Sequence, residues 1–198
     1  KGTGFAEMLN TAKAAQTAAM GLLTDSQYPP RNLEAYQAQY GPVTLVLPAL
    51  LEANYAPAEE NPDRDFIQSA MDDYGVTDCM TLERGGVTYG LFGLMGVDSD
   101  DCAPTSGFTL TDAAEAAKRC VEKLKGEGAE IILCLSHSGT AEAPAVSEDE
   151  ELAKAVDGID VIISGHTHTT LAEPLVVNDT YIVSCGPYCQ NLGSLTFT

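Results

Sequence analysis

Two short apolar runs constrain the fold of this chain more than any other feature. One is Ile131–Leu135 and the other is Asp160–Ser164, and aliphatic side chains follow one another in both without polar alternation. Runs of this length are typical of strands that are buried on both faces of a parallel sheet. Because predicted helices alternate with these strands, the sequence predicts an α/β fold.

Helical patterns stand before each of the two runs. The first helix is capped by Thr111 or Asp112 and extends to about Lys125. The second covers about 147–156 and begins with Ser147 followed by Glu150, the spacing of a capping box. We therefore expect the two strands to be neighbours in one sheet, with both helices outside it.

The other elements carry weaker patterns, apart from one hairpin. A Gly-Gly pair at 85–86 separates two β-rich segments, 79–84 and 87–94, and predicts a tight turn between them. Helices are predicted over 4–20, 33–40 and 65–74, strands over 43–51, near 174–184 and near 192–198, an Asn-Asp turn at 178–179, and loops over 55–63 and 96–110. We expect residues 1–198 to form a single domain.

The charge balance excludes some classes of partner. The net charge is -19, from 29 acidic and 10 basic residues. Such a chain repels nucleic acids and anionic membrane surfaces, and no apolar run reaches the ~20 residues that span a bilayer. The charge itself fits simple solubility, export or the recruitment of cations. The chain opens on Lys1 without a signal peptide pattern, which indicates an excised or processed chain and leaves its export open.

The three histidines are the main functional signal. His137 follows the first apolar run, and His166 and His168 follow the second. Because the carboxyl ends of neighbouring parallel strands meet at one edge of a sheet, we expect these imidazoles to converge. Neutral imidazole is a good ligand for divalent transition metals, and nearby hydroxyls such as Ser136 and Ser164 could orient the rings. Isolated loop histidines with local hydrogen bonds are the alternative, which their grouping disfavours.

Both histidine segments resemble motifs of a known family. Ser164–Thr169 looks like the Gly-His-x-His motif of calcineurin-like metallophosphoesterases, and Leu135–Gly139 looks like their single-histidine motif. The intervening 149–160 is similar to the branch of bacterial 5'-nucleotidases and 2',3'-cyclic-nucleotide phosphodiesterases. The resemblance covers about 75–198 and more loosely 1–74, within which 17–48 is interpreted as an insertion.

The resemblance implies a fold and a chemistry. The fold is an α/β/β/α sandwich of mixed sheets, the metallo-dependent phosphatase type. The cofactors are two divalent metal ions (Mn, Zn, Fe, Mg or Ca), with His137 and His166 on one ion and His168 on the other. The reaction is hydrolysis of nucleotides or similar small phosphoesters by metal-activated water. The location implied is extracellular or at the cell surface, with the cytoplasm left open.

The sequence departs from this family in one large respect. The family places Asp-x-His, Gly-Asp and Asn-His-Glu motifs before the region seen here, and none occurs in this chain. We therefore expect the C-terminal part of a catalytic domain, an incomplete fold whose partner is the missing N-terminal part. The isolated chain is expected to be inactive. The alternative is a non-catalytic α/β metal-binding module.

Three further patterns favour structural roles. The Cys185–Cys189 segment has three residues between its cysteines, one more than a thioredoxin-type motif, and the six cysteines predict no disulfide framework. The glycines at 90, 93 and 96 are interpreted as sites of close packing rather than a phosphate loop. The aspartates at 98, 100 and 101 lack the calcium-loop spacing and are interpreted as a solvated loop.

Overall fold

The fold is known from a computed structural model that describes residues 50–102, 106–141, 147–188 and 190–197. The helices predicted over 4–20 and 33–40, the segment interpreted as an insertion and most of the strand predicted over 43–51 lie outside the described residues. The single-domain prediction for 1–198 therefore stays a prediction.

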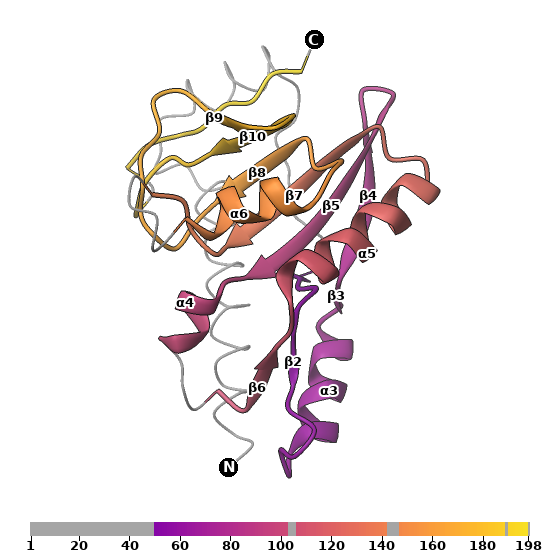
Figure 1. The fold of residues 1–198 in the computed structure, drawn as a ribbon. Coiled ribbons are helices and arrows are strands. Elements are labelled where there is room, and N and C mark those ends of the chain that lie inside the picture. Colours follow the sequence, from indigo (N-terminus) through magenta and orange to yellow (C-terminus); the bar gives the residue numbers. More distant parts are fainter. Residues whose placement is uncertain (1–49, 103–105, 142–146, 189, 198) are drawn as a thin grey trace, which may run out of the picture.

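A six-stranded mixed sheet organises the described residues (Figure 1). Its order is β4-β5-β7-β8-β10-β9, with β4 Cys79–Arg84, β5 Val87–Met95, β7 Ile131–His137, β8 Val161–Ser164, β10 Thr180–Val183 and β9 Leu175–Val177. The four central strands run parallel, and the edge strands β4 and β9 are antiparallel to their neighbours. The prediction that the two apolar runs form adjacent strands is confirmed by the pairing of β7 with β8.

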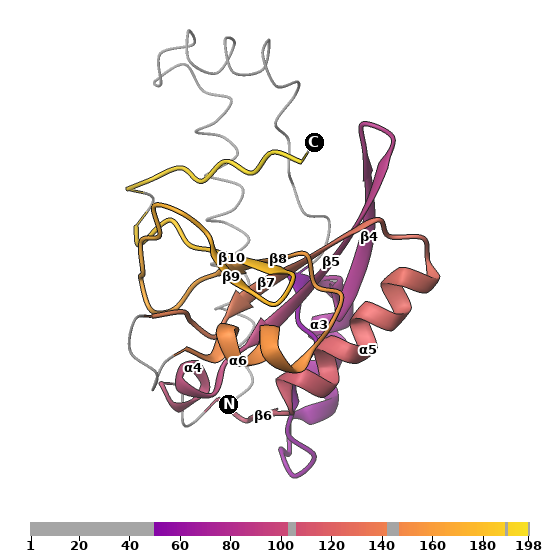
Figure 2. The ribbon, with the colours of Figure 1, turned by 45° about the horizontal axis from the view of Figure 1, so that its top comes forward.

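Smaller elements surround this sheet. The helices are α3 Arg64–Asp73, α4 Val97–Asp101, α5 Ala113–Gly126 and α6 Glu148–Ala155, and two small sheets pair β1 Leu50–Leu51 with β3 Val76–Thr77 and β2 Tyr55–Pro57 with β6 Phe108–Leu110. Figure 2 shows α5 and α6 lying over the same face of the large sheet. The α/β class and the mixed sheet are confirmed. The four-layer sandwich stays a prediction.

The core lies between that sheet face and the helices. Alternate residues of the central strands point toward the helices, and Phe92, Cys134, Ile162 and Ile182 are 0% exposed. Leu124 of α5 is buried against them. Helix α5 is formed as predicted, because the Asp112 carboxylate accepts a hydrogen bond from the Glu115 amide and caps its first turn.

The turn predicted at 178–179 is confirmed: β9 and β10 form a hairpin around Asn178, whose φ is 52°. Other local predictions were wrong. The predicted loop 96–110 contains α4 and β6. The strand predicted near 192–198 is absent from the described 192–197. Ser147 does begin α6, but its hydroxyl donates to the Ala141 carbonyl, and Glu150 accepts a hydrogen bond from Thr140 instead of completing a capping box.

Glycines admit close backbone contacts, as predicted. A Cβ atom on Gly93 would overlap the carbonyl oxygen of Leu51, and one on Gly96 would overlap the Cα atom of Ser138. At the hairpin, Gly85 and Gly86 have φ values of 61° and 81°, the left-handed conformation that a tight two-residue turn requires.

Replacing Gly93 with alanine should destabilise the fold. The added methyl meets the Leu51 backbone, which cannot move aside without breaking the Ala53 N–H to Gly93 carbonyl bond of 2.9 Å. We expect a loss of about 2 kcal/mol or more in the free energy of unfolding, measured by urea denaturation. The control is Gly126→Ala at the end of α5, where nothing lies within 4 Å and alanine should be neutral or stabilising. Equal stability of the two variants would contradict this packing.

Candidate metal centre

The ends of β7 and β8 bring the two histidine segments together. The register pairs Ser136 with Ser164, so that His137 and Gly165 leave the sheet at the same level. The Gly165 amide donates to the Ser136 carbonyl at 2.9 Å. A Cβ atom on Gly165 would lie 3.1 Å from Nδ1 of His137, so glycine allows the second segment to pass beside the first imidazole.

Two of the three predicted histidines are in direct contact. The rings of His137 and His166 have centroids 5.2 Å apart and meet edge to face, with 64° between their planes. His168 lies two residues further, and its ring packs against Tyr188 with centroids 5.1 Å apart. The structure thus joins His137 with His166, and the convergence of His168 on the same ions stays a prediction.

The segment that carries two of the histidines is held in an unusual backbone conformation. His166 and His168 have φ values of 65° and 57°, the left-handed region, which costs about 1–2 kcal/mol for each residue with a side chain. Thr167 between them compensates by bonding Thr140 in the other segment: its hydroxyl donates to the Thr140 carbonyl at 2.6 Å and accepts from the Thr140 amide at 3.2 Å. The Thr169 hydroxyl donates to the same carbonyl. Backbone strain kept in this way is typical of functional sites.

The electrostatics favour neutral imidazole at His137. Partial burial lowers the pKa of His137, and the neighbouring His166 and His168 lower it further. A histidine with a lowered pKa keeps a free lone pair at neutral pH, which is the form that binds a metal ion.

A buried carboxyl group lies beneath the strand ends. Asp149 of α6 is 0% exposed and accepts a hydrogen bond of 2.5 Å from the Ser136 hydroxyl. Burial raises the pKa of Asp149 to about 6, and the hydroxyls of Ser136 and Ser164 lower it in part. The Ser136 hydroxyl therefore bonds Asp149 rather than a histidine, and this bond ties α6 to β7.

Asp98 is the functional candidate that sequence reasoning missed. It was interpreted as part of a solvated loop, but its Oδ2 lies 2.7 Å from Nε2 of His166. A signal was present: Asp98 follows the end of β5, a third parallel strand, and so belongs to the same sheet edge as the histidines.

The donor type fits a divalent metal ion, but the donor number does not. Imidazole nitrogens suit zinc, iron, nickel and copper ions. Yet among the described residues no group of three or more His, Cys, Asp or Glu side chains is arranged to hold a metal ion. The residues of this chain therefore fit a part of a ligand set.

Comparisons with known proteins relate the chain to metallophosphoesterases. No protein-family model matches the chain. An uncharacterised metallophosphoesterase of Bacillus subtilis is 38% identical over 92 residues, which are 46% of this chain and 18% of the relative. A trifunctional nucleotide phosphoesterase of the same organism is 34% identical over 124 residues, 60% of this chain and 8% of the relative. The chain is related to the metallophosphoesterases.

Other relatives of this chain carry the names apyrase and probable 5'-nucleotidase. Among solved structures, a 5'-nucleotidase precursor of Thermus thermophilus aligns with a TM-score of 0.51 and 24% identity over 68% of this chain and 27% of its own, which shows a shared fold. The matched segment is less than a fifth of the length of the two Bacillus relatives.

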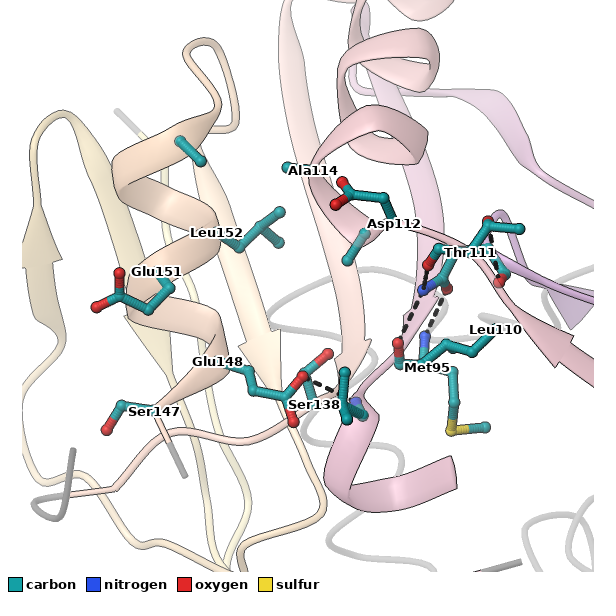
Figure 3. Close-up of a pocket in the computed structure, with 14 residues that line it drawn as sticks. Met95, Leu110, Thr111, Asp112, Ala114, Ser138, Ser147, Glu148, Glu151 and Leu152 are labelled. Carbon is teal, nitrogen blue, oxygen red and sulfur yellow. Dashed lines mark hydrogen bonds between the residues drawn. The ribbon is translucent and has the colours of Figure 1, made fainter. Parts of the chain in front are cut away.

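Two cavities lie away from the histidines. One of about 450 Å³ opens between the start of α5 and helix α6, and Figure 3 shows Leu152, Glu148 and Asp112 on its wall. The other, of about 540 Å³, is bordered by Glu52 and Arg119. None of the three histidines lines either cavity.

No helix in the described part of the chain is long and apolar enough to span a membrane.

The buried Asp149 should make stability depend on pH. Its folded pKa of about 6 lies above its ordinary value of 3.8, so the folded chain retains a proton that the unfolded chain has released between these pH values. The contribution of this retained proton to the free energy of unfolding is fully present below pH 3.8 and is lost as the pH rises through about 6. An asparagine at this position cannot ionise, so the Asp149→Asn variant should not lose this stability at high pH. The loss in wild type is about 3 kcal/mol at most in the free energy of unfolding.

The measurement is urea denaturation of wild type and variant between pH 4 and 7.5, roughly the range over which Asp149 ionises. As the pH rises, the free energy of unfolding of Asp149→Asn should increase relative to that of wild type. The exposed Asp157→Asn on the loop after α6 serves as the control and should follow wild type. Parallel pH profiles for wild type and Asp149→Asn would contradict the burial argument.

Proposed function

We propose that this chain is the C-terminal part of the catalytic domain of a metal-dependent phosphoester hydrolase of the 5'-nucleotidase type. The substrates are nucleotides or similar small phosphoesters. The observation that carries the proposal is the edge contact of His137 with His166 at the ends of two adjacent parallel strands. The names of the relatives, metallophosphoesterase, nucleotide phosphoesterase and 5'-nucleotidase, support the reaction class.

Three imidazoles of this chain contribute to a centre of two divalent ions. His137 and His166 would hold one ion and His168 the other. The remaining ligands, a carboxylate among them, would come from an N-terminal part of the same protein. When bound, the two ions activate water and neutralise the charge of the phosphate.

The residues of this chain prepare the site by fixing geometry. The bonds between Thr140 and Thr167 hold the second histidine segment against the first, so little ordering remains to be done when ligands bind. The lowered pKa of His137 keeps its lone pair free at neutral pH. We further propose an extracellular or cell-surface location, which fits the net charge of -19.

An assay of two proteins tests the function. Residues 1–198 alone, and a longer product that includes the coding sequence upstream of Lys1, are incubated with AMP or an aryl phosphate and Mn²⁺ or Zn²⁺. The longer protein should hydrolyse both substrates, and residues 1–198 should not, because three imidazoles without a carboxylate hold two ions poorly. In the longer protein, His166→Ala should lower kcat/KM at least about a thousandfold.

The control for His166→Ala is Glu173→Gln, an exposed position in the same connection between β8 and β9, which should retain activity. Metal-dependent turnover by residues 1–198 alone, abolished by His166→Ala, would contradict the incomplete site. A longer protein that carries the three N-terminal motifs and is still inactive would favour the metal-binding module over the nucleotidase.

A further inference from the structure

Helix α4 is fastened to the end of the strand that carries the first histidine. The Gly96 amide donates to the His137 carbonyl at 3.4 Å, and the Ser99 hydroxyl donates to the same oxygen. A side chain on Gly96 would overlap Ser138, so the start of α4 lies directly against the segment after β7.

Helix α6 holds α4 from another side. The Glu148 carboxylate accepts hydrogen bonds from the amides of Val97 at 2.9 Å and of Asp98 at 3.0 Å. Bonds from amides to an ionised carboxylate are stronger than neutral ones, and this carboxylate satisfies two amides of the first turn that have no partner within the helix. The backbone of Asp98 is therefore fixed relative to both β7 and α6.

The fixed backbone presents the Asp98 carboxylate to the ring of His166. Oδ2 lies 2.7 Å from Nε2, and the His166 side chain is only 17% exposed although that of Asp98 is 54% exposed. An ionised carboxylate can only accept, so this contact favours the tautomer with the proton on Nε2. In a neutral ring with this tautomer the lone pair lies on Nδ1, the nitrogen on the other side of the ring from Asp98.

We propose that Asp98 is a positioning residue for His166. It fixes the Nε2–H tautomer and makes Nδ1 the nitrogen that binds a divalent ion. This assignment rests on the proposed function, and histidines that bind metals commonly donate their second nitrogen to a carboxylate in this way. Asp98 acts through the imidazole and touches neither substrate nor metal.

The alternative is an ordinary surface ion pair, which would show the same distance between Asp98 and His166 without fixing the orientation of the imidazole. Exposed pairs between flexible side chains contribute little because ordering both of them offsets the attraction. Here Glu148, Gly96 and Ser99 already order the segment that carries Asp98. The bonds between Thr140 and Thr167 hold the segment of His166. The pair is therefore preorganised from both sides.

The test is the tautomer of His166 observed by NMR. Residues 1–198 with ¹⁵N-labelled histidine are studied without metal near pH 8, and His166 is assigned with a His166→Gln variant. Wild type should show a protonated Nε2 and an unprotonated Nδ1. Asp98→Ala should shift His166 toward a mixture of tautomers, whereas Asp98→Asn should retain the Nε2–H form because its amide oxygen still accepts. Asp101→Ala on the same helix is the matched control and should follow wild type.

Addition of Zn²⁺ supplies the second readout. In wild type the Nδ1 signal of His166 should respond, and Asp98→Ala should raise the Zn²⁺ concentration for half-saturation on the order of tenfold. A wild-type His166 with its proton on Nδ1, a Zn²⁺ response at Nε2, or an Asp98→Ala spectrum identical to wild type would overturn the proposal. Failure of the hydrolysis assay overturns the proposed function separately, since these spectra require no turnover.

Discussion

The parallel pairing of β7 and β8 determines where everything at the candidate site lies. Ser136 stands opposite Ser164, so both strands end at the same level and both histidine segments leave the sheet at one edge. The same register turns Cys134 and Ile162 toward α5 and α6, where they are 0% exposed. A shift of one residue in this pairing would move the core residues to the opposite face and separate the histidines.

Hydrogen bonds beneath and between the two histidine segments fix their positions further. Asp149 ties α6 to Ser136, and the Thr140–Thr167 pair offsets the strained backbone around His166. Helix α4 reaches the same edge from β5 and brings Asp98 to His166. Three consecutive parallel strands, β5, β7 and β8, are thus each followed by one polar segment of the candidate site.

The sequence was informative where local patterns agree with tertiary packing. The buried runs of β7 and β8, the glycine hairpin and the Asp112 cap need no distant partner to be recognised. Helix α4 was missed because five residues carry no measurable periodicity, and its stability depends on Glu148, 50 residues further along the chain. The strand predicted near 192–198 failed for the opposite reason: β-rich composition predicts a strand only where a neighbour supplies its hydrogen bonds. The contact between Asp98 and His166 depends on sheet order, which the sequence patterns left open.

The central claim is that the histidines of this chain belong to one centre of divalent ions completed by other residues of the same protein. The most direct test is anomalous X-ray diffraction from crystals of the longer protein grown with Mn²⁺. The account predicts two anomalous peaks at roughly 2.0–2.3 Å from imidazole nitrogens, one shared by His137 and His166 and one at His168. Peaks at other positions, with all three imidazoles free of metal, would contradict it.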